Sequence, residues 1–438
     1  MSQGGGGSTG FAGRGGAAPL LDELDARGLI HQLTDREGLA AALAAGPVTF
    51  YCGYDPSAPS LHCGNLVPLS IMARLARAGH KMIALVGGAT GMIGDPSGKS
   101  EERKLLGLDV LEANKAAMRG QIQRLVAADA AQVDNHDWLG RFGFLEFLRD
   151  VGKHVTVNYM LAKDSVSARL NDREQGISYT EFTYMLLQGY DFAHLARTQG
   201  CTLQIGGSDQ WGNITCGIEL SRRLGNPTQV FGLTAPLLLT SSGKKFGKSE
   251  EGAVWLDAAR TSPYRFYQFW LNTEDADVAR YLKMFTFAPL EEIEATMTAH
   301  DVERGRRIAQ RRLAEDVTRW VHGPDALARV LKASQVMFGG AIDGLGDEDL
   351  EPLLGDVPSS ELAAATLDAG LPLVDLLVTT KLADSKGAAK RLLAQGGVYV
   401  NNVKQTDEAR VVGATDRATP RFVVLRAGKK SYHLIKIT

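Results

Sequence analysis

Short apolar runs alternate with helix-like stretches in the first half of the chain. Val48–Cys52 and Met82–Val86 are mostly apolar runs of strand length, and glycines follow them, Gly53 after the first and Gly87-Gly88 after the second. Such runs are typical of strands that are buried on both faces. Between them, Leu66–Ala78 has the pattern of a helix. Because strand and helix alternate, we expect a parallel α/β sheet.

The predicted strands also indicate where a ligand would bind. In a parallel sheet, ligands bind beyond the carboxyl ends of the strands. Tyr51–Asp55 and Gly87–Asp95 fall at those ends. We therefore expect a pocket at this edge of the sheet.

The pattern changes to a helical one after residue 262. Pro263 is suited to the first turn of a helix, and Arg306–Val321 places apolar residues three and four positions apart among charged ones. Residues 341–370 then contain eight acidic and no basic side chains. Glycine and proline are interspersed there, which indicates a linker with some helix.

The C-terminal segment mixes helix and strand. The apolar stretch Leu371–Leu377 leads into a basic helix, Ser385–Ala394, and the turn Gly396-Gly397 then precedes a strand, Val398–Asn401. The whole chain is expected to have five parts: a flexible glycine-rich N-terminus (residues 1–18), a sheet domain (19–261), a helical domain (262–340), an acidic linker (341–370) and a small α+β module (371–438).

The composition is that of an ordinary globular protein. Of 438 residues, 44% are hydrophobic and 22% charged, and a chain of this length is expected to form more than one domain. No apolar run is long enough to span a membrane and the N-terminus lacks signal-peptide regions, so a cytoplasmic location is expected. The cysteines have no CxxC spacing, so we expect free thiols without zinc or a disulfide bridge. They are Cys52, Cys63, Cys201 and Cys216.

Charge is distributed unevenly along the chain. Residues 381–438 carry twelve Lys/Arg and four Asp/Glu, which gives +8 and leaves −10 for the remainder of a chain whose net charge is −2. The basic tail is therefore a candidate surface for a polyanion.

Two short motifs about 180 residues apart suggest the chemistry. His62-Cys63-Gly64-Asn65 opens the first predicted helix, and Lys244–Ser249 follows the apolar run Phe231–Leu239. Gly94–Ser100 and Gly243–Ser249 each have three residues between their glycines, whereas a Walker A motif needs four, which counts against a P-loop NTPase. The motifs at residues 62–65 and 244–249, which occur in this order along the chain, resemble the HIGH and KMSKS signatures of class I aminoacyl-tRNA synthetases.

A predicted helix carries a polar stripe. Ser178 and Glu181 have the spacing of a capping box, and Tyr184, Gln188 and Asp191 follow on one helix face. A solvated stripe is one interpretation. However, large apolar residues flank these positions, which favours a buried face whose polar groups need partners.

A further segment narrows the resemblance. Ile205–Asn213 contains Gly-Ser-Asp-Gln-Trp-Gly-Asn, which closely resembles a segment of the tyrosyl-tRNA synthetases, as do Tyr51–Pro56 and Gly94–Gly98. The resemblance to the bacterial members of this family covers roughly residues 20–438. This sequence departs from the family pattern at Asn65, where the family more often has His. It departs from the class pattern at Phe246-Gly247, where that pattern has Met-Ser.

The resemblance implies a site for each substrate of an ATP-dependent tyrosine–tRNA ligase. The residues implied to bind tyrosine are Tyr51, Asp95, Tyr184, Gln188, Asp191 and Gln210. Those implied to bind ATP are Gly53, Asp55, His62, Asn65, Asp209, Lys245, Lys248 and Ser249. The cations implied to hold the departing pyrophosphate are Lys99, Arg103, Lys245 and Lys248. Mg²⁺ is expected to accompany ATP, with no metal ligated by a dedicated protein site.

The same resemblance implies the remaining architecture and the partners. The sheet domain is expected to be Rossmann-like, followed by an α-helical domain on the anticodon side and an S4-like RNA-binding module. The expected partners are L-tyrosine, ATP, tRNA(Tyr) and a second copy of the chain, with the homodimer joined around Phe142–Lys163 and no membrane involved.

Two alternatives remain open at this point. A tryptophanyl enzyme would use the same chemistry, but Tyr51 and Asp191 suit a phenol. An RNA-binding protein that keeps the fold with little catalysis is of another class, and the intact Lys245, Lys248, Asp95, Asp209 and Gln210 argue against it. Tight binding of non-cognate structured RNA on a filter, without aminoacylation, would favour that second alternative.

The paired lysines generate a first prediction. Lys248→Ala should slow formation of the tyrosyl-adenylate much more than it weakens tyrosine binding, because a cation that meets developing charge acts mainly in the transition state. Single-turnover adenylate formation and equilibrium tyrosine binding measure the two effects separately. Comparable losses in both would contradict the role.

Overall fold

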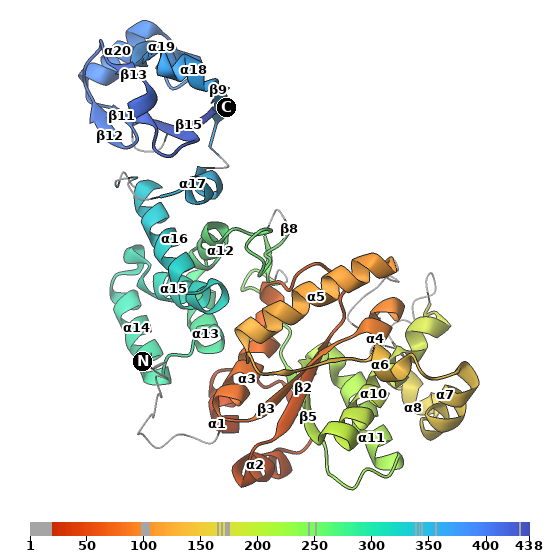
Figure 1. The fold of residues 1–438 in the computed structure, drawn as a ribbon. Helices are drawn as coiled ribbons and strands as arrows, with labels where there is room; N and C mark the ends of the chain where they lie inside the picture. Colours follow the sequence, from red (N-terminus) through yellow and green to blue (C-terminus); the bar gives the residue numbers. More distant parts are fainter. Residues whose placement is uncertain are drawn as a thin grey trace, which may run out of the picture. The chain divides into compact units, whose positions relative to one another are not determined.

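The computed structural model describes most of the chain, in two compact units (Figure 1). The first unit combines residues 20–60 with Gly64–Leu238, and the second combines Leu61–Cys63 with the described part of Leu239–Thr438. The described residues are 20–97, 106–163, 166–167, 170, 176–243, 246–249, 252–337, 340, 342, 345–354, 357–428 and 431–438. The predicted flexible N-terminus, residues 1–18, lies outside them.

The first unit is built on a six-stranded sheet. Five neighbouring strands are parallel, and the short edge strand β1 is antiparallel to β6. In sheet order the strands are β1 (Gln32–Leu33), β6 (Phe231–Ala235), β5 (Cys201–Gly207), β2 (Thr49–Tyr54), β3 (Lys81–Val86) and β4 (Ala131–Asp134). The chain runs outward from β2 to β4 and returns to β5 beside β2, so the strand order reverses there. Ligands bind at such a reversal in open α/β sheets.

Helices pack on both faces of this sheet, with α3 and α5 on one side and α10 and α11 on the other (Figure 1). The strands are apolar on both faces because both are covered. The helices of this unit are α1 (Leu20–Ala26), α2 (Arg36–Ala45), α3 (Leu66–Arg77), α4 (Gly88–Ile93), α5 (Leu108–Leu125), α6 (His136–Leu139), α7 (Phe144–Asp150), α8 (Val157–Leu161), α10 (Tyr179–Gln199) and α11 (Trp211–Arg223).

The longest described helix is α10, with 21 residues. Its N-cap is Ser178, whose side chain accepts a hydrogen bond from the backbone N–H of Glu181 at 3.2 Å, as the capping motif predicts. Polar side chains interrupt its apolar surface, and nowhere in the described part of the chain is a helix both long and apolar enough to cross a membrane.

The second unit contains the predicted helical region. Pro263 stands at the first position of α12 and Ser262 caps it, while the predicted helix at 306–321 is α15. A two-stranded hairpin of β7 (Lys248–Ser249) and β8 (Gly252–Ala253) precedes the helices. The helices are α12 (Pro263–Leu271), α13 (Asp275–Phe285), α14 (Leu290–Val302), α15 (Ile308–His322) and α16 (Pro324–Met337).

The C-terminal part of the second unit is a five-stranded sheet with helices beside it. In sheet order its strands are β12 (Val403–Gln405), β11 (Val398–Val400), β14 (Phe422–Ala427), β15 (Ser431–Ile437) and β9 (Ser359–Leu362). The remaining elements are α17 (Asp347–Leu354), α18 (Ala364–Asp368), β10 (Leu371–Pro372), α19 (Leu373–Thr379), α20 (Lys386–Ala394) and β13 (Val411–Val412).

Two details of this sheet differ from the sequence interpretation. Within the segment expected to be a linker, β9 pairs in parallel with β15 and is therefore part of the sheet. The strand predicted at Val398–Asn401 ends at Val400, because Asn401 and Asn402 have φ of 50° and 62°. Two residues in this left-handed region form a tight turn between β11 and β12.

Candidate active site

Asp191 is the most enclosed acidic group of the predicted tyrosine-binding set. It lies on α10 with 2% of its surface exposed. Trp138 Nε1 donates a hydrogen bond to one carboxylate oxygen at 2.8 Å, and Asn135 Nδ2 donates to the other at 2.9 Å. The indole of Trp138 stacks on the ring of His194 with centroids 4.5 Å apart, which fixes its direction. Asn135 lies at the corner between β4 and α6, and Trp138 lies in α6 itself.

Burial dominates the electrostatics of Asp191. Loss of water raises the pKa of its carboxyl from 3.8 to about 8, although the hydrogen bonds from Asn135 and Trp138 lower it. The nearby carboxylates of Asp55 and Asp134 add to the increase in pKa. The two donors therefore favour the ionised form against the effect of burial.

Tyr51 is a second buried polar residue of the predicted tyrosine-binding set. It lies in β2 with 1% of its surface exposed, and its ring centroid is 5.6 Å from that of Phe192. Burial raises the pKa of Tyr51 well above its ordinary value, and the negative charge of Asp191 contributes. Among the described residues, no group forms a hydrogen bond with its hydroxyl. An unpaired buried hydroxyl is costly unless a ligand supplies the partner.

Tyr184 and Asp55 form the next part of the site. The Tyr184 hydroxyl donates to one oxygen of Asp55 at 2.8 Å, and the Thr90 hydroxyl donates to the other oxygen at 2.7 Å. Thr90 Oγ1 also accepts a hydrogen bond from Asn135 Nδ2 at 2.9 Å. Asp55, which was predicted to bind ATP, is thus connected to the partners of Asp191.

A second polar group surrounds Gln210, which lies beyond the end of β5. Its amide nitrogen donates to Asp95 at 2.7 Å and to Asp209 at 3.2 Å. Asn213 is buried beside it and donates to Gln188 Oε1 at 2.9 Å and to Gln210 Oε1 at 3.3 Å. Carboxylate and amide oxygens therefore gather where β5 ends.

The three polar residues predicted on one face of α10 take part in these contacts. Tyr184 and Asp191 are buried and Gln188 is half-buried. All three contact polar groups from other elements of the first unit. The interpretation as a buried face is confirmed, and the solvated stripe is excluded.

In the second unit, the two signature motifs are connected through the backbone. Val254, which follows β8, donates its N–H to the carbonyl of Gly247 at 3.0 Å and accepts from the N–H of Cys63 at 2.9 Å. His62 forms an isolated bridge with Trp255, and their ring centroids are 6.3 Å apart. The motif order alone predicted a shared mechanism, and the structure adds a direct backbone connection between them.

Phe246 explains one departure from the class signature. It is buried, and its ring lies 5.0 to 5.9 Å from four aromatic rings of α12 and α13. These belong to Phe269, Trp270, Tyr281 and Phe285. An aromatic residue here ties the lysine-bearing segment to the helical region.

The structure describes the remaining predicted site residues to different extents. Lys99, Arg103 and Lys245 lie outside the described residues. Lys248 and Ser249 form β7, for which the backbone alone is described. Gly53 is exposed in β2, and Asn65 precedes α3 as its N-cap without a side-chain capping bond.

Four site residues were not assigned from the sequence. Thr90, Asn135 and Trp138 support Asp55 and Asp191, and Asn213 connects Gln188 with Gln210. Asn213 lies within the Gly-Ser-Asp-Gln-Trp-Gly-Asn segment, so its buried amide was open to prediction. Asn135 and Trp138 follow a four-residue strand that has no strong apolar pattern.

The fold and the site define a class of protein. A parallel sheet whose order reverses beside a set of polar acceptors, together with two connected signature motifs, is typical of class I aminoacyl-tRNA synthetases. Comparison with known proteins agrees: the chain belongs to the family "tRNA synthetases class I (W and Y)", whose model matches residues 43–339. A second model, "Tyrosine--tRNA ligase SYY-like C-terminal domain", matches residues 349–435.

Nearly full-length relatives are named tyrosine--tRNA ligase. The one from Opitutus terrae is 51% identical over 425 residues, covering 95% of this chain and 99% of the relative. Tyrosine--tRNA ligase 1 of Bacillus subtilis is 49% identical over 422 residues, with the same coverage of 95% and 99%. A solved C-terminally truncated mitochondrial tyrosyl-tRNA synthetase of Aspergillus nidulans is 33% identical, with a TM-score of 0.66 over 74% of this chain and 95% of that chain. The predicted family, fold class and activity, an ATP-dependent tyrosine–tRNA ligase, are confirmed.

The raised pKa of Asp191 generates a prediction for stability. Between about pH 4 and pH 8 the folded protein keeps a proton on Asp191 that the unfolded chain has lost, so this group makes the protein less stable as pH rises through that window. Asp191→Asn removes the effect. From pH 5 to pH 8.5, the free energy of unfolding of the variant should rise relative to the unsubstituted protein by at least about 1.4 kcal/mol, the equivalent of one pKa unit.

Urea unfolding of both proteins at the two pH values, without substrates, measures this change. Hydrogen bonds lost in the variant change its free energy of unfolding equally at both pH values. A difference in the free energy of unfolding between the two proteins that stays constant with pH would therefore contradict the prediction.

Proposed function

We propose that Asp191 and Tyr51 bind the phenol group of L-tyrosine. The supporting observation is the pairing of a buried carboxylate, fixed by two donors, with a buried hydroxyl that has no partner among the described residues. A phenol can donate to Asp191 and accept from Tyr51. Phenylalanine would leave the buried Tyr51 hydroxyl without a partner and could not donate to Asp191, and this costs free energy.

Asp95, Tyr184, Gln188 and Gln210 are proposed to bind the amino-acid backbone of the substrate. An ammonium group needs several acceptors, which the carboxylate of Asp95, the hydroxyl of Tyr184 and the amide oxygen of Gln188 are proposed to supply. Gln210 is proposed to lie beside the reacting carboxylate of the substrate. The hydrogen bonds from Asn213 to both amide oxygens support this, because they fix the orientation of the two amides before the substrate binds.

ATP is proposed to bind through residues carried over from the family. These are Gly53, Asp55, His62, Asn65, Asp209, Lys245, Lys248 and Ser249. Lys99 and Arg103, together with the two lysines of the second motif, are proposed to hold the departing pyrophosphate. The backbone connection between Cys63, Val254 and Gly247 supports a joint role of the two motifs.

The proposed chemistry needs no general base in its first step. An oxygen of the ionised tyrosine carboxylate attacks the α-phosphorus of ATP, the bond to the bridging oxygen breaks, and pyrophosphate leaves with that electron pair. Catalysis then depends on alignment and on cations that meet the growing negative charge. We propose that Mg²⁺ accompanies the phosphates without a protein-built metal site. In the second step, a hydroxyl of the terminal ribose of tRNA attacks the tyrosyl carbonyl, and the bond from that carbonyl to the phosphate oxygen of AMP breaks. AMP leaves with the electron pair, and the hydroxyl proton passes to the departing phosphate or to water.

The basic C-terminal module is proposed to bind the phosphates of tRNA(Tyr), as an S4-like module would. Lys381, Lys386, Lys390, Arg391 and Lys404 are all exposed. Contacts of this kind give affinity that falls with salt and carries little sequence information. A cytoplasmic location is proposed with this function.

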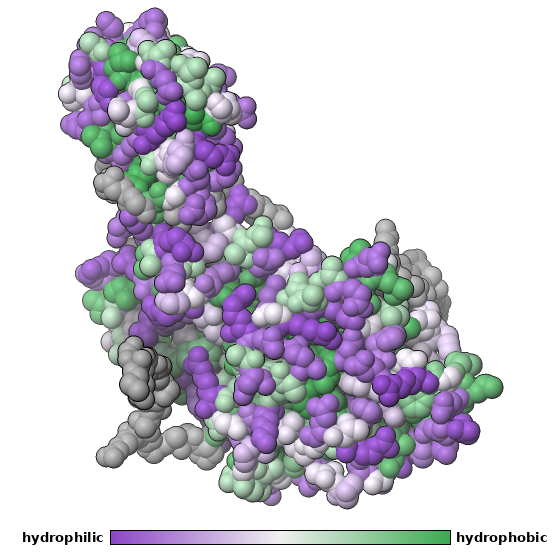
Figure 2. Space-filling model, viewed as in Figure 1, coloured by the Kyte–Doolittle hydropathy of each residue, from purple (hydrophilic) through white to green (hydrophobic). Residues whose placement is uncertain are grey.

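A homodimer joined around Phe142–Lys163 is also proposed. Helix α7 has no buried residue, and Phe144 and Leu145 are 66% and 78% exposed. Val157, at the start of α8, is 58% exposed. Figure 2 shows hydrophobic surface at the right edge of the molecule, where Figure 1 places α7. Exposed apolar side chains in such a group are typical of a protein interface.

The substrate assignment predicts the outcome of pyrophosphate–ATP exchange. With Mg²⁺, the protein should catalyse exchange with tyrosine and not with tryptophan or phenylalanine.

Asp191→Ala should raise the KM for tyrosine at least about tenfold, because a buried hydrogen bond to the phenol is lost. Asp316→Ala is a control, because Asp316 is not among the residues proposed to bind tyrosine and instead pairs with Arg312 and Arg319 on α15. Exchange with tryptophan would overturn the assignment of the pocket, and no exchange with any of the three would favour the RNA-binding alternative.

The dimer generates a separate prediction. Leu145→Glu should produce monomers in sedimentation equilibrium, because burying a charge in an apolar interface is unfavourable. Val302→Glu is a matched control on α14, where Val302 is 80% exposed. A monomeric unsubstituted protein, or equal dissociation in both variants, would count against this interface.

A further inference from the structure

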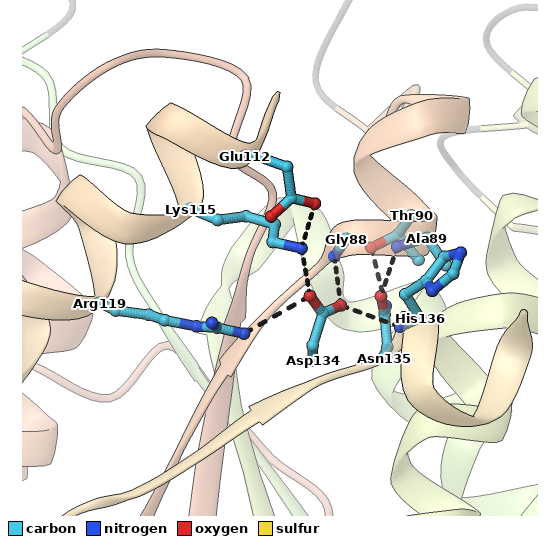
Figure 3. A network of polar contacts seen from close by, with 9 residues as sticks. All are labelled: Gly88, Ala89, Thr90, Glu112, Lys115, Arg119, Asp134, Asn135 and His136. Atoms are coloured by element: carbon cyan, nitrogen blue, oxygen red, sulfur yellow. Dashed lines mark hydrogen bonds and ion pairs between the residues drawn. The ribbon is translucent and has the colours of Figure 1, made fainter. Parts of the chain in front are cut away.

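Asp134 is a buried carboxylate that the proposed chemistry does not use. It ends β4, and 7% of its surface is exposed. One oxygen accepts hydrogen bonds from the backbone N–H groups of Gly88 at 3.0 Å and His136 at 2.9 Å. The other oxygen lies 2.5 Å from Lys115 Nζ and 3.5 Å from an Arg119 nitrogen (Figure 3). One side chain thus connects the first residues of α4 and α6 with α5.

The contact with α4 depends on a glycine. A Cβ atom at position 88 would lie 2.3 Å from the Asp134 oxygen. Any larger residue would push the carboxylate away from the backbone of α4. The sequence at 88 therefore permits the close approach that Asp134 uses.

The two basic residues of α5 keep Asp134 ionised. Burial alone would raise its pKa, but hydrogen bonds from Lys115 and from the His136 backbone, with the charges of Lys115 and Arg119, hold the pKa below its ordinary value. Lys115 is also largely buried, with 9% of its side chain exposed, and it forms a second ion pair with Glu112 at 2.6 Å. An ionised carboxylate can satisfy two N–H donors and two cations together.

The next residues in the chain hold Asp191. Asn135 follows Asp134 directly and donates to Asp191, while its side-chain oxygen accepts from the Ala89 N–H at 2.8 Å. Trp138 lies one helical turn further and donates to the other Asp191 oxygen. A movement of this corner would therefore shift both donors on Asp191.

We propose that Asp134 is a positioning residue for tyrosine selectivity: by fixing α4, α6 and α5 to one another, it orients Asn135 and Trp138 on Asp191. This inference rests on the proposed role of Asp191 as the acceptor of the substrate phenol. The described contacts of Asp134 are with Gly88, His136, Lys115 and Arg119, none of which is proposed to bind tyrosine or ATP. Asn135 and Trp138 donate to Asp191 directly, whereas Asp55 is reached only through Thr90. Asp134 should therefore change the affinity for tyrosine much more than the affinity for phenylalanine or ATP.

Steady-state pyrophosphate–ATP exchange by the full chain tests the proposal. Asp134→Ala should raise the KM for tyrosine about tenfold, the effect of weakening one buried hydrogen bond, while the inhibition constant of phenylalanine and the KM for ATP change less than about twofold. Asp134→Asn should retain most of the tyrosine affinity, because its amide oxygen can accept from both backbone N–H groups. Asp316→Ala is the matched carboxylate control and should change none of these values.

A second set of variants addresses the case in which Asp134→Ala does not fold. Lys115→Met leaves the N–H contacts of Asp134 but removes its nearest cation, and should also raise the KM for tyrosine. In the double variant Lys115→Met/Asp134→Asn, the carboxylate that lost its nearest cation is replaced by a neutral amide. The KM for tyrosine should then return toward the value of Asp134→Asn alone, whereas the effects of two independent sites would add.

The outcomes separate the inference from the assignment it rests on. If Asp191→Asn leaves the KM for tyrosine unchanged, both the phenol assignment and this inference fail. If Asp191→Asn raises the KM and neither Asp134→Ala nor Lys115→Met does, this inference alone fails. Equal changes in the values for tyrosine, phenylalanine and ATP would indicate a general structural effect and also overturn it.

Discussion

Asp191 lies within α10 with almost none of its surface exposed, and a carboxylate in such a place needs polar groups to replace the water it has lost. Asn135 and Trp138 supply them, one on each oxygen. Their own positions then have to be fixed, which links α10 to the corner between β4 and α6. From Asn135 the hydrogen bonds continue through Thr90 to Asp55 and Tyr184. The burial of this one carboxyl group thus constrains five other side chains of the first unit, those of Asn135, Trp138, Thr90, Asp55 and Tyr184.

In the second unit, backbone contacts replace this side-chain network. Gly247, Val254 and Cys63 are joined by successive N–H to carbonyl hydrogen bonds, so moving one signature motif relative to the other would break at least one of these bonds. Asp277 adds a further constraint, because its carboxylate accepts from the N–H and the hydroxyl of Ser241, both at 2.9 Å. The lysine-bearing segment is therefore held on one side by Asp277 and on the other by the aromatic packing of Phe246.

Local pattern was sufficient to predict β2, β3 and the face of α10 that carries the proposed site residues. The strands β2 and β3 are apolar on both faces, and the cap at Ser178 and the spacing of Tyr184, Gln188 and Asp191 are properties of adjacent turns. The two donors to Asp191 are 56 and 53 residues away in the chain, and no local periodicity indicates such a contact. The strand β9 was missed for a related reason, since it joins a sheet whose other strands begin about 40 residues later.

The roles of individual residues depended on resemblance rather than on physical pattern. A lysine pair beside glycine is usually a solvated loop, and nothing in its spacing specifies a phosphate. Recognition and catalysis also place different demands on a fold. A phenol is best selected by acceptors and donors whose orientation is already fixed, so side chains with this role are expected on buried strands and helices. A leaving pyrophosphate needs positive charge within reach, which a long lysine side chain provides from a short hairpin if the backbone below it is anchored. The contacts fit this difference: the residues proposed to select tyrosine are embedded in a hydrogen-bond network, whereas the lysine-bearing segment is secured by Phe246 and Asp277.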